Sequence, residues 1–189
     1  MRISSIEWCR KPLMRISWKG GVMKLLMVIA QERFRDEEFF EPKQIFEKKN
    51  FLITVASQKK GVAVSKLGVK VNVDNSLHDV VVSQYDAVVF VGGRGAHVYF
   101  DDPVAHAVAN SFVQQKKIVG AICAAPSILA NAGLLKGKKA TCTPDQKENL
   151  KANGAKVLEQ DVVVDGKFIT ADGPKAATKF GETIVKALG

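Results

Sequence analysis

Short apolar runs alternate with stretches of helical periodicity along most of the chain. Four runs, at 24–30, 51–57, 86–91 and 118–122, are bounded by charged or small residues, as expected of buried strands in a parallel sheet. The stretches between them place apolar residues at helical spacing. Strands that alternate with helices in this way predict an α/β fold, a three-layer, doubly wound sandwich with a mostly parallel sheet.

Helix and turn signals define the remaining segments. Asp102 followed by Pro103 has the residue types of an N-cap and a first helical position. Asp165-Gly166 is a turn signal between two β-branched pieces, which predicts a hairpin. The predicted helices are 38–49, 103–115, 124–132, 144–153 and 174–188. The other predicted segments are a charged loop at 31–37, a hairpin-like excursion at 61–73 and a short strand at 139–142.

Cys123 stands at the junction of the strand at 118–122 and the helix that follows. Pro126 lies early in that helix and Gly133 just beyond its end, the usual order of start and stop signals. The junction resembles a nucleophile elbow, a tight turn that holds one side chain above the sheet near the unpaired NH groups of a helix. This position predicts a reactive thiol with a lowered pKa. The alternative is a buried cysteine that packs as a small hydrophobic residue.

A pair of glycines follows the strand at 86–91, and in open α/β sheets the ligand site lies beyond the carboxyl ends of the strands. Gly92 and Gly93 would let backbone NH groups approach a substrate closely. With the NH of Ala124 they could form an oxyanion hole for a carbonyl attacked by Cys123. The alternative for the two glycines is a tight turn.

Glu37 and Glu38 follow the first strand and are both candidates for an acidic partner of the thiol. An ionised carboxylate beside Cys123 would raise the pKa of the thiol. A glutamic acid held neutral in an apolar pocket would instead donate a hydrogen bond to the thiolate and later move a proton. The alternative is that both acids serve only to favour the dipole at the start of their helix.

Composition and charge exclude several other kinds of site. The net charge of +9 comes from basic residues interleaved with acids, without an arginine-rich stripe, so no nucleic-acid partner is predicted. Cys9, Cys123 and Cys142 form no CxxC pair, and the three histidines share no helix face. Neither a disulfide framework nor a metal site is therefore predicted, and no other cofactor is expected. The cysteine usage predicts a reducing cytoplasm.

The first 22 residues differ from the rest of the chain. They carry five basic residues and one acidic residue, and they lack the apolar core of a signal peptide. Met14 and Met23 are in-frame alternatives for the start. We therefore expect 1–22 to be a disordered extension or the product of a mis-called start codon, and 23–189 to be a single domain. The chain contains no span of about 20 apolar residues, so no contact with a membrane is predicted.

Four stretches together resemble the ThiJ/PfpI superfamily, which includes protein deglycases, glyoxalase III-like proteins and the intracellular protease I group. They are FRDEEFFEP at 34–42, DAVVFVGG at 86–93, GAICAAPSILANAGLLKGKKAT at 120–141 and ITADGP at 169–174. The resemblance implies a flavodoxin-like fold of the class I glutamine amidotransferase type and association into a homo-oligomer. It also matches Cys123 to the family cysteine, and Glu38, four residues before Pro42, to the glutamate that meets it. The matching backbone donors are Gly92, Gly93 and Ala124.

Two histidines of other branches of the family are missing from this sequence. Ala124 directly follows the cysteine where the protease-like branch has a histidine, and Thr143 stands where another branch has one. His97, in the loop after the glycines, could reach the site instead. Cys142, next to Thr143, could also approach it, although packing within a strand is the alternative for that residue.

The residues and the resemblance together predict a cysteine-dependent enzyme. Its substrate would be a small reactive carbonyl such as methylglyoxal, or an adduct of it, bound as a hemithioacetal on Cys123 with Glu38 as proton carrier. Peptide hydrolysis is less expected because no histidine stands ready to protonate the leaving amine. The other classes are a redox-sensing or stress-protective protein, in which Cys123 is oxidised to sulfinic acid, and a binding module without chemistry.

Overall fold

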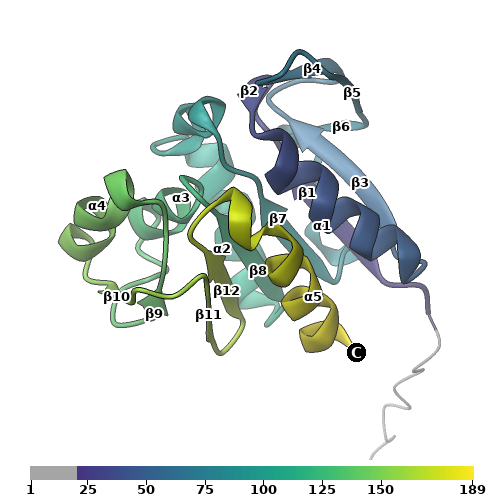
Figure 1. Ribbon diagram of the computed structural model, residues 1–189. Coiled ribbons are helices and arrows are strands. Elements are labelled where there is room, and N and C mark those ends of the chain that lie inside the picture. The colour runs from purple at the N-terminus through teal and green to yellow at the C-terminus, as the bar shows by residue number, and fades with distance from the viewer. Residues whose placement is uncertain (1–20) are drawn as a thin grey trace, which may run out of the picture.

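A seven-stranded sheet forms the centre of the protein. The computed structural model describes residues 21–189, so all of the predicted extension except its last two residues lies outside the described part. The strands of the sheet are β1 Lys24–Val28, β3 Leu52–Ser57, β6 Asn75–Ser76, β7 Ala87–Phe90, β8 Ile118–Ile122, β11 Val162–Asp165 and β12 Phe168–Ala171. Their order is β11-β12-β8-β7-β1-β3-β6, and every neighbouring pair is parallel except β11 with β12 (Figure 1).

Helices cover both faces of this sheet. The α-helices are α1 Asp36–Lys48, α2 Pro103–Gln114, α3 Pro126–Asn131, α4 Lys147–Ala152 and α5 Ala177–Leu188. The short 3₁₀ turns are η1 Leu77–Asp79, η2 Val82–Gln84, η3 Arg94–Tyr99, η4 Pro144–Gln146 and η5 Pro174–Ala176. Helices α1 and α5 lie side by side on one face, and α2 lies on the other (Figure 1).

The alternation of side chains along β1 explains these layers. Leu25 and Met27 point into the core beneath α1 and α5, whereas Leu26 and Val28 point into the core on the side of α2 and α3. All four side chains are at least 99% buried, as expected of a parallel strand covered on both faces. The structure thus confirms the predicted α/β sandwich with a mostly parallel, flavodoxin-like sheet.

Two small sheets flank the central one, and several segments in or next to them differ from the predictions. The first contains β2 Glu32–Phe34, β4 Gly61–Ser65 and β5 Lys70–Val73. The hairpin-like excursion is confirmed as the antiparallel pair β4 and β5, but the predicted charged loop is wrong, because its middle is strand β2, parallel to β4. Helix α1 also begins at Asp36, two residues before the prediction.

The second small sheet pairs β9 Lys139–Ala140 with β10 Lys156–Val157. The strand predicted at 139–142 is therefore shorter than expected and lies outside the central sheet. Cys142 follows this strand instead of lying within it, so its predicted place as a strand residue is wrong. Its side chain is nevertheless fully buried in the core on the side of α2 and α3.

The carboxyl ends of four adjacent strands lie at the same level. Val28 pairs with Phe90, and Phe90 pairs with Ala121, while Ile122 pairs with Ala171. The loops that leave β1, β7, β8 and β12 therefore begin beside one another. This edge is where a doubly wound sheet places its ligand site.

Candidate active site

Cys123 occupies a strained turn between β8 and α3. Its φ of 64° lies in the left-handed region, which costs a residue with a side chain about 1–2 kcal/mol. Backbone hydrogen bonds hold the turn: the Cys123 NH donates to the Ala171 carbonyl at 2.9 Å, and the Thr143 NH donates to the Cys123 carbonyl at 2.9 Å. The side chain is only partly buried. The elbow predicted from the sequence is thus present, and the thiol reaches a cavity.

Backbone NH groups approach the thiol from two sides. The NH groups of Gly93 and Ala124 both act to lower the pKa of Cys123, because they stabilise a negative charge on sulfur. The NH of Gly92 acts instead on the carboxyl group of Glu38. Of the three donors expected around the cysteine, the structure places two at sulfur and one at the acid.

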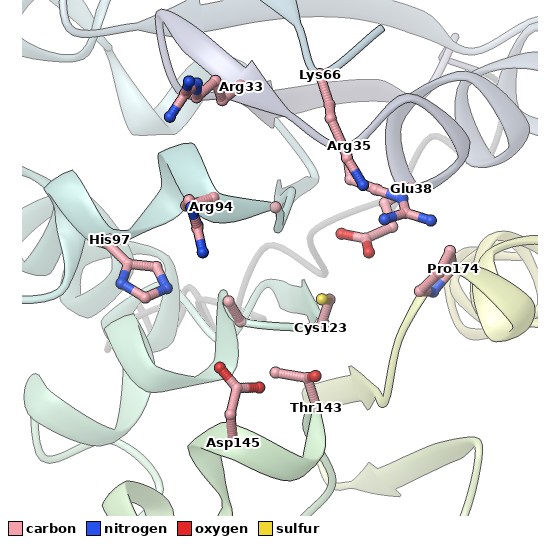
Figure 2. A pocket seen from close by; sticks show the side chains of 12 residues that line it. Arg33, Arg35, Glu38, Lys66, Arg94, His97, Cys123, Thr143, Asp145 and Pro174 are labelled. Carbon is pink, nitrogen blue, oxygen red and sulfur yellow. The ribbon is translucent and has the colours of Figure 1, made fainter.

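Glu38 is buried directly beside the thiol. Its side chain is 0% exposed, and neither carboxyl oxygen has a hydrogen-bond partner at ordinary geometry among residues 21–189. Figure 2 shows the carboxyl group directed toward the sulfur of Cys123. Burial raises the pKa of Glu38 to about 7, against the opposing effects of the Cys123 thiol and the positive charge of Arg35.

Glu37 points elsewhere, although it is the next residue along the chain. Its carboxylate pairs with Arg35 at 2.8 Å and is 41% exposed. This contact lowers the pKa of Glu37. The choice between the two acids, left open by the residues alone, is thus resolved by orientation, since only Glu38 faces the cysteine.

The pKa of Cys123 is raised to about 12 by burial, with the charge of Glu38 as the next cause. The expected lowering of the Cys123 pKa is therefore wrong, because desolvation of the sulfur outweighs the NH groups of Gly93 and Ala124. The two groups titrate as a pair. The carboxyl group gives up its proton first, near neutral pH, and then stands as a base beside a protonated thiol.

The remaining candidate residues, His97, Thr143 and Cys142, differ in whether they line the cavity. His97 lines the cavity, and its ring stacks on Phe100 with centroids 4.5 Å apart. Thr143 also lines the cavity and anchors the elbow through its NH group. Cys142 is outside the cavity, and burial raises its pKa to about 12. Of these three, His97 and Thr143 are placed to meet a ligand.

A cavity of about 670 Å³ opens above Cys123 and Glu38 (Figure 2). Most of the lining was not predicted from the sequence: two of the missed residues lie within the quoted family stretches without a role assigned to them, and the others lie outside those stretches. The missed lining residues are Arg33, Arg35, Lys66, Arg94, Asp145 and Pro174.

Close backbone packing between β2 and η3 builds the upper wall of this cavity. The Arg35 NH donates to the Gly92 carbonyl at 3.2 Å. A Cβ atom at Gly95 would lie 1.9 Å from the Glu32 carbonyl oxygen, so only glycine allows the two segments to touch there. At the end of η3, the buried Tyr99 hydroxyl donates to the Ile29 carbonyl at 2.9 Å. Close backbone contacts and hydrogen bonds therefore hold both ends of this wall in place.

Within residues 21–189, no group of three or more His, Cys, Asp or Glu side chains is arranged to hold a metal ion. No helix of the same range is long and apolar enough to cross a membrane.

A doubly wound sheet with a cysteine on a strained elbow and a buried glutamate beside it defines a class of proteins, and sequence comparison identifies that class. Residues 23–187 match the DJ-1/PfpI family, and the chain belongs to it. This result confirms the resemblance to the ThiJ/PfpI superfamily.

Individual relatives agree with this assignment. An uncharacterized protein of Methanocaldococcus jannaschii is 44% identical over 168 residues, which cover 87% of this chain and 82% of the relative. A deglycase of Thermococcus kodakarensis is 32% identical, over 88% of this chain and 99% of its own. The crystal structure of a ThiJ/PfpI domain protein from Brachyspira murdochii has a TM-score of 0.87 at 35% identity, covering 89% of this chain and 98% of that one.

Proposed function

We propose that the protein is a cysteine-dependent enzyme that acts on small reactive carbonyls, or on their adducts with amines and thiols, as glyoxalase III and deglycase enzymes do. The observation that carries this proposal is the fully buried carboxyl group of Glu38 directed at the Cys123 thiol. A carboxyl group with a pKa near 7 is well matched to proton transfer at neutral pH. The deglycase from Thermococcus kodakarensis among the relatives supports the same chemistry.

The first step is addition of the thiol to the carbonyl. Cys123 Sγ attacks the carbonyl carbon, a carbon–sulfur bond forms, and the S–H proton passes to the carboxylate of Glu38. The carbonyl electron pair moves onto oxygen, near the NH groups of Gly93 and Ala124, which act as an oxyanion hole. Glu38 then gives its proton to that oxygen, and the product is a hemithioacetal.

Glu38 can also carry the second step without a histidine. With methylglyoxal, its carboxylate removes the proton from the carbon bonded to sulfur, and a proton is returned to the neighbouring carbonyl carbon. This transfer converts the hemithioacetal into a lactoyl thioester of Cys123. Water cleaves the thioester to lactate and restores the thiol, so methylglyoxal and water give lactate without an oxidant or a reductant.

Turnover of methylglyoxal by the full chain tests this proposal. We expect many equivalents of lactate per Cys123, no turnover by Cys123→Ser, and a loss of about 10²- to 10⁴-fold in kcat for Glu38→Gln. Glu37→Gln is the matched control and should stay within a few-fold of the wild type. Consumption limited to one equivalent, or a Glu38→Gln variant as active as the wild type, would contradict the mechanism.

A redox-responsive role for Cys123 is the second candidate. The observation in its favour is the pair of NH groups at sulfur, from Gly93 and Ala124, which could also hold the oxygens of a sulfinic acid. In that case peroxide should oxidise Cys123 to the sulfinic acid in the folded protein without overoxidation, as intact-mass measurement would show, and methylglyoxal should not be consumed catalytically.

A further inference from the structure

In the part of the chain that the structure describes, arginine is concentrated around the cavity. The three arginines of residues 21–189 are Arg33, Arg35 and Arg94, and all of them line it. Lys66 lines it as well. The guanidinium group is the side chain best suited to bind carboxylate and phosphate groups through two parallel hydrogen bonds. Within residues 21–189, the confinement of arginine to one cavity therefore calls for an explanation beyond general surface charge.

Most of these cations lack a counter-ion. Arg35 pairs with Glu37, but Arg33, Lys66 and Arg94 make no side-chain hydrogen bond or ion pair within the part of the chain that the structure describes. In Figure 2 the Arg94 side chain extends into the middle of the cavity, between Arg33 and Cys123. Like charges gathered without partners repel one another, and a bound anion would relieve that repulsion.

The backbone holds these cations in place. Arg33 has a φ of 57°, in the left-handed region, and thus carries strain. A Cβ atom at Gly93 would lie 2.6 Å from the Arg35 nitrogen and 2.8 Å from the Arg33 carbonyl oxygen, which shows how tightly β2 lies on the η3 segment. This contact fixes the Cα positions of all three arginines relative to one another.

The turn that carries Lys66 is fixed in a similar way. The buried Asp36 carboxylate accepts hydrogen bonds from the Ser65 hydroxyl and, at 3.1 Å, from the Leu67 NH. The Lys66 NH donates to the Phe34 carbonyl at 2.8 Å. Lys66 is thus presented to the cavity by a turn bonded on both sides of it.

On the basis of the function proposed above, we infer that the substrate carries an anionic group, a phosphate or a carboxylate, close to its reactive carbonyl. Arg94 and Arg33 bind this group, with Lys66 adding charge, while the carbonyl reaches Cys123. The acidic residues of the lining are Glu38, which holds its proton below about pH 7, and Asp145. Methylglyoxal is uncharged and would form no ion pair with these cations.

Alkylation of Cys123 tests the anion site without any turnover. Iodoacetate and iodoacetamide present the same reacting carbon, but only iodoacetate is charged. Below pH 7 we expect the ratio of their rates at Cys123 to exceed the ratio for the uncharged thiol 2-mercaptoethanol by about tenfold, because the cations concentrate the anion. The ratio should fall toward the free-thiol value in Arg94→Gln and in Arg33→Gln, and in high salt. Lys167→Gln removes an exposed charge at the opposite end of β12 and should change nothing. A wild-type ratio equal to that of the free thiol would overturn the inference.

Protection and turnover then identify the anion. Inorganic phosphate that slows iodoacetamide labelling more than acetate at equal ionic strength would assign a phosphate site, and the reverse order a carboxylate site; no protection by either contradicts the inference. For turnover, hydroxypyruvaldehyde and its 3-phosphate form a matched pair, and we expect kcat/KM to be at least about tenfold higher for a phosphate substrate if phosphate is the anion. A charge preference in alkylation without turnover of either compound would support the anion site and contradict the proposed function. Equal turnover of both compounds without a charge preference in alkylation would support the proposed function and contradict the anion site.

Discussion

Gly92 lies against the carboxyl group of Glu38 so closely that a Cβ atom at position 92 would be 2.5 Å from Glu38 Oε2. The same Cβ would lie 2.5 Å from the Ile122 carbonyl oxygen and 2.8 Å from Cys123 Cβ. The glycine thus occupies the space where the acid, the elbow and β8 meet. Its small size, rather than its conformational freedom, is what the site requires at this position.

Gly92→Ala should therefore damage both stability and chemistry. Because the Ile122 carbonyl belongs to a buried strand and cannot move aside, we expect a loss of about 1–3 kcal/mol in the free energy of unfolding and a displaced Glu38. Urea denaturation and the rate of Cys123 alkylation measure the two effects. Gly173→Ala is the control, since a Cβ there meets no atom within 4 Å. A Gly92→Ala protein as stable as this control would show that the contact is not tight.

Glu38 should make the fold less stable as the pH rises. Its pKa is about 7 in the folded protein and about 4.5 ordinarily, so between these values the unfolded chain loses a proton that the folded chain keeps. Stability from this group is complete below about pH 4.5 and falls through pH 7, by about 3 kcal/mol in all. The free energy of unfolding of wild type minus that of Glu38→Gln, measured at pH 5 and pH 8, should show this fall.

The matched control is Glu37→Gln, because Arg35 lowers the pKa of Glu37. The corresponding difference for that variant should not decrease with pH. A difference for Glu38→Gln that is independent of pH would mean that Glu38 is ionised throughout this range.

The strain at Cys123 predicts an unusual order of stability among variants that lack the thiol. At a φ of 64° glycine avoids the cost that any residue with a Cβ incurs. Cys123→Gly should therefore be more stable than Cys123→Ala by about 1 kcal/mol, although a glycine variant is normally less stable than the alanine variant at the same position. Thermal unfolding of the two variants decides the point, and the usual order would indicate that the elbow relaxes.

The Asp36 and Ser65 pair should be important for the turn at Lys66. Ser65→Ala leaves a buried carboxylate without one of its two donors, at a cost of about 1–3 kcal/mol. We expect faster proteolysis at the turn and a loss in the free energy of unfolding. Ser111→Ala removes an exposed hydroxyl that bonds only within its own helix, and should have little effect. Equal losses in the two variants would argue against a special role for Asp36.

The elbow was predictable because its signals are local. An apolar strand, Pro126 in the first turn of a helix and Gly133 beyond its end place Cys123 at the junction without knowledge of the rest of the fold. The strand ends that meet at this edge follow in the same way from the parallel sheet. The residues alone narrowed the acid to Glu37 and Glu38, and the family resemblance selected Glu38, which is the one that faces the sulfur in the structure.

The cationic wall and the pKa of the thiol were not predictable, for physical reasons. Strand β2 has three residues, two of them charged and exposed, so its sequence has no strand pattern, and its place depends on glycines some 60 residues later. The thiol pKa depends on how much water reaches the sulfur. That quantity is set by packing around the whole site, whereas the sequence indicated only the groups that would stabilise the thiolate.

The Tyr99 hydroxyl, which donates to the Ile29 carbonyl and lies 3.3 Å from the Ser57 hydroxyl, joins the end of η3 to the ends of β1 and β3. The segment that carries Arg94 and His97 is therefore immobilised when the protein folds, not when a ligand arrives. Binding at this wall then involves little additional loss of backbone entropy. The affinity of the cavity should accordingly depend on the charge and shape of its ligand, with little contribution from closure of the protein around it.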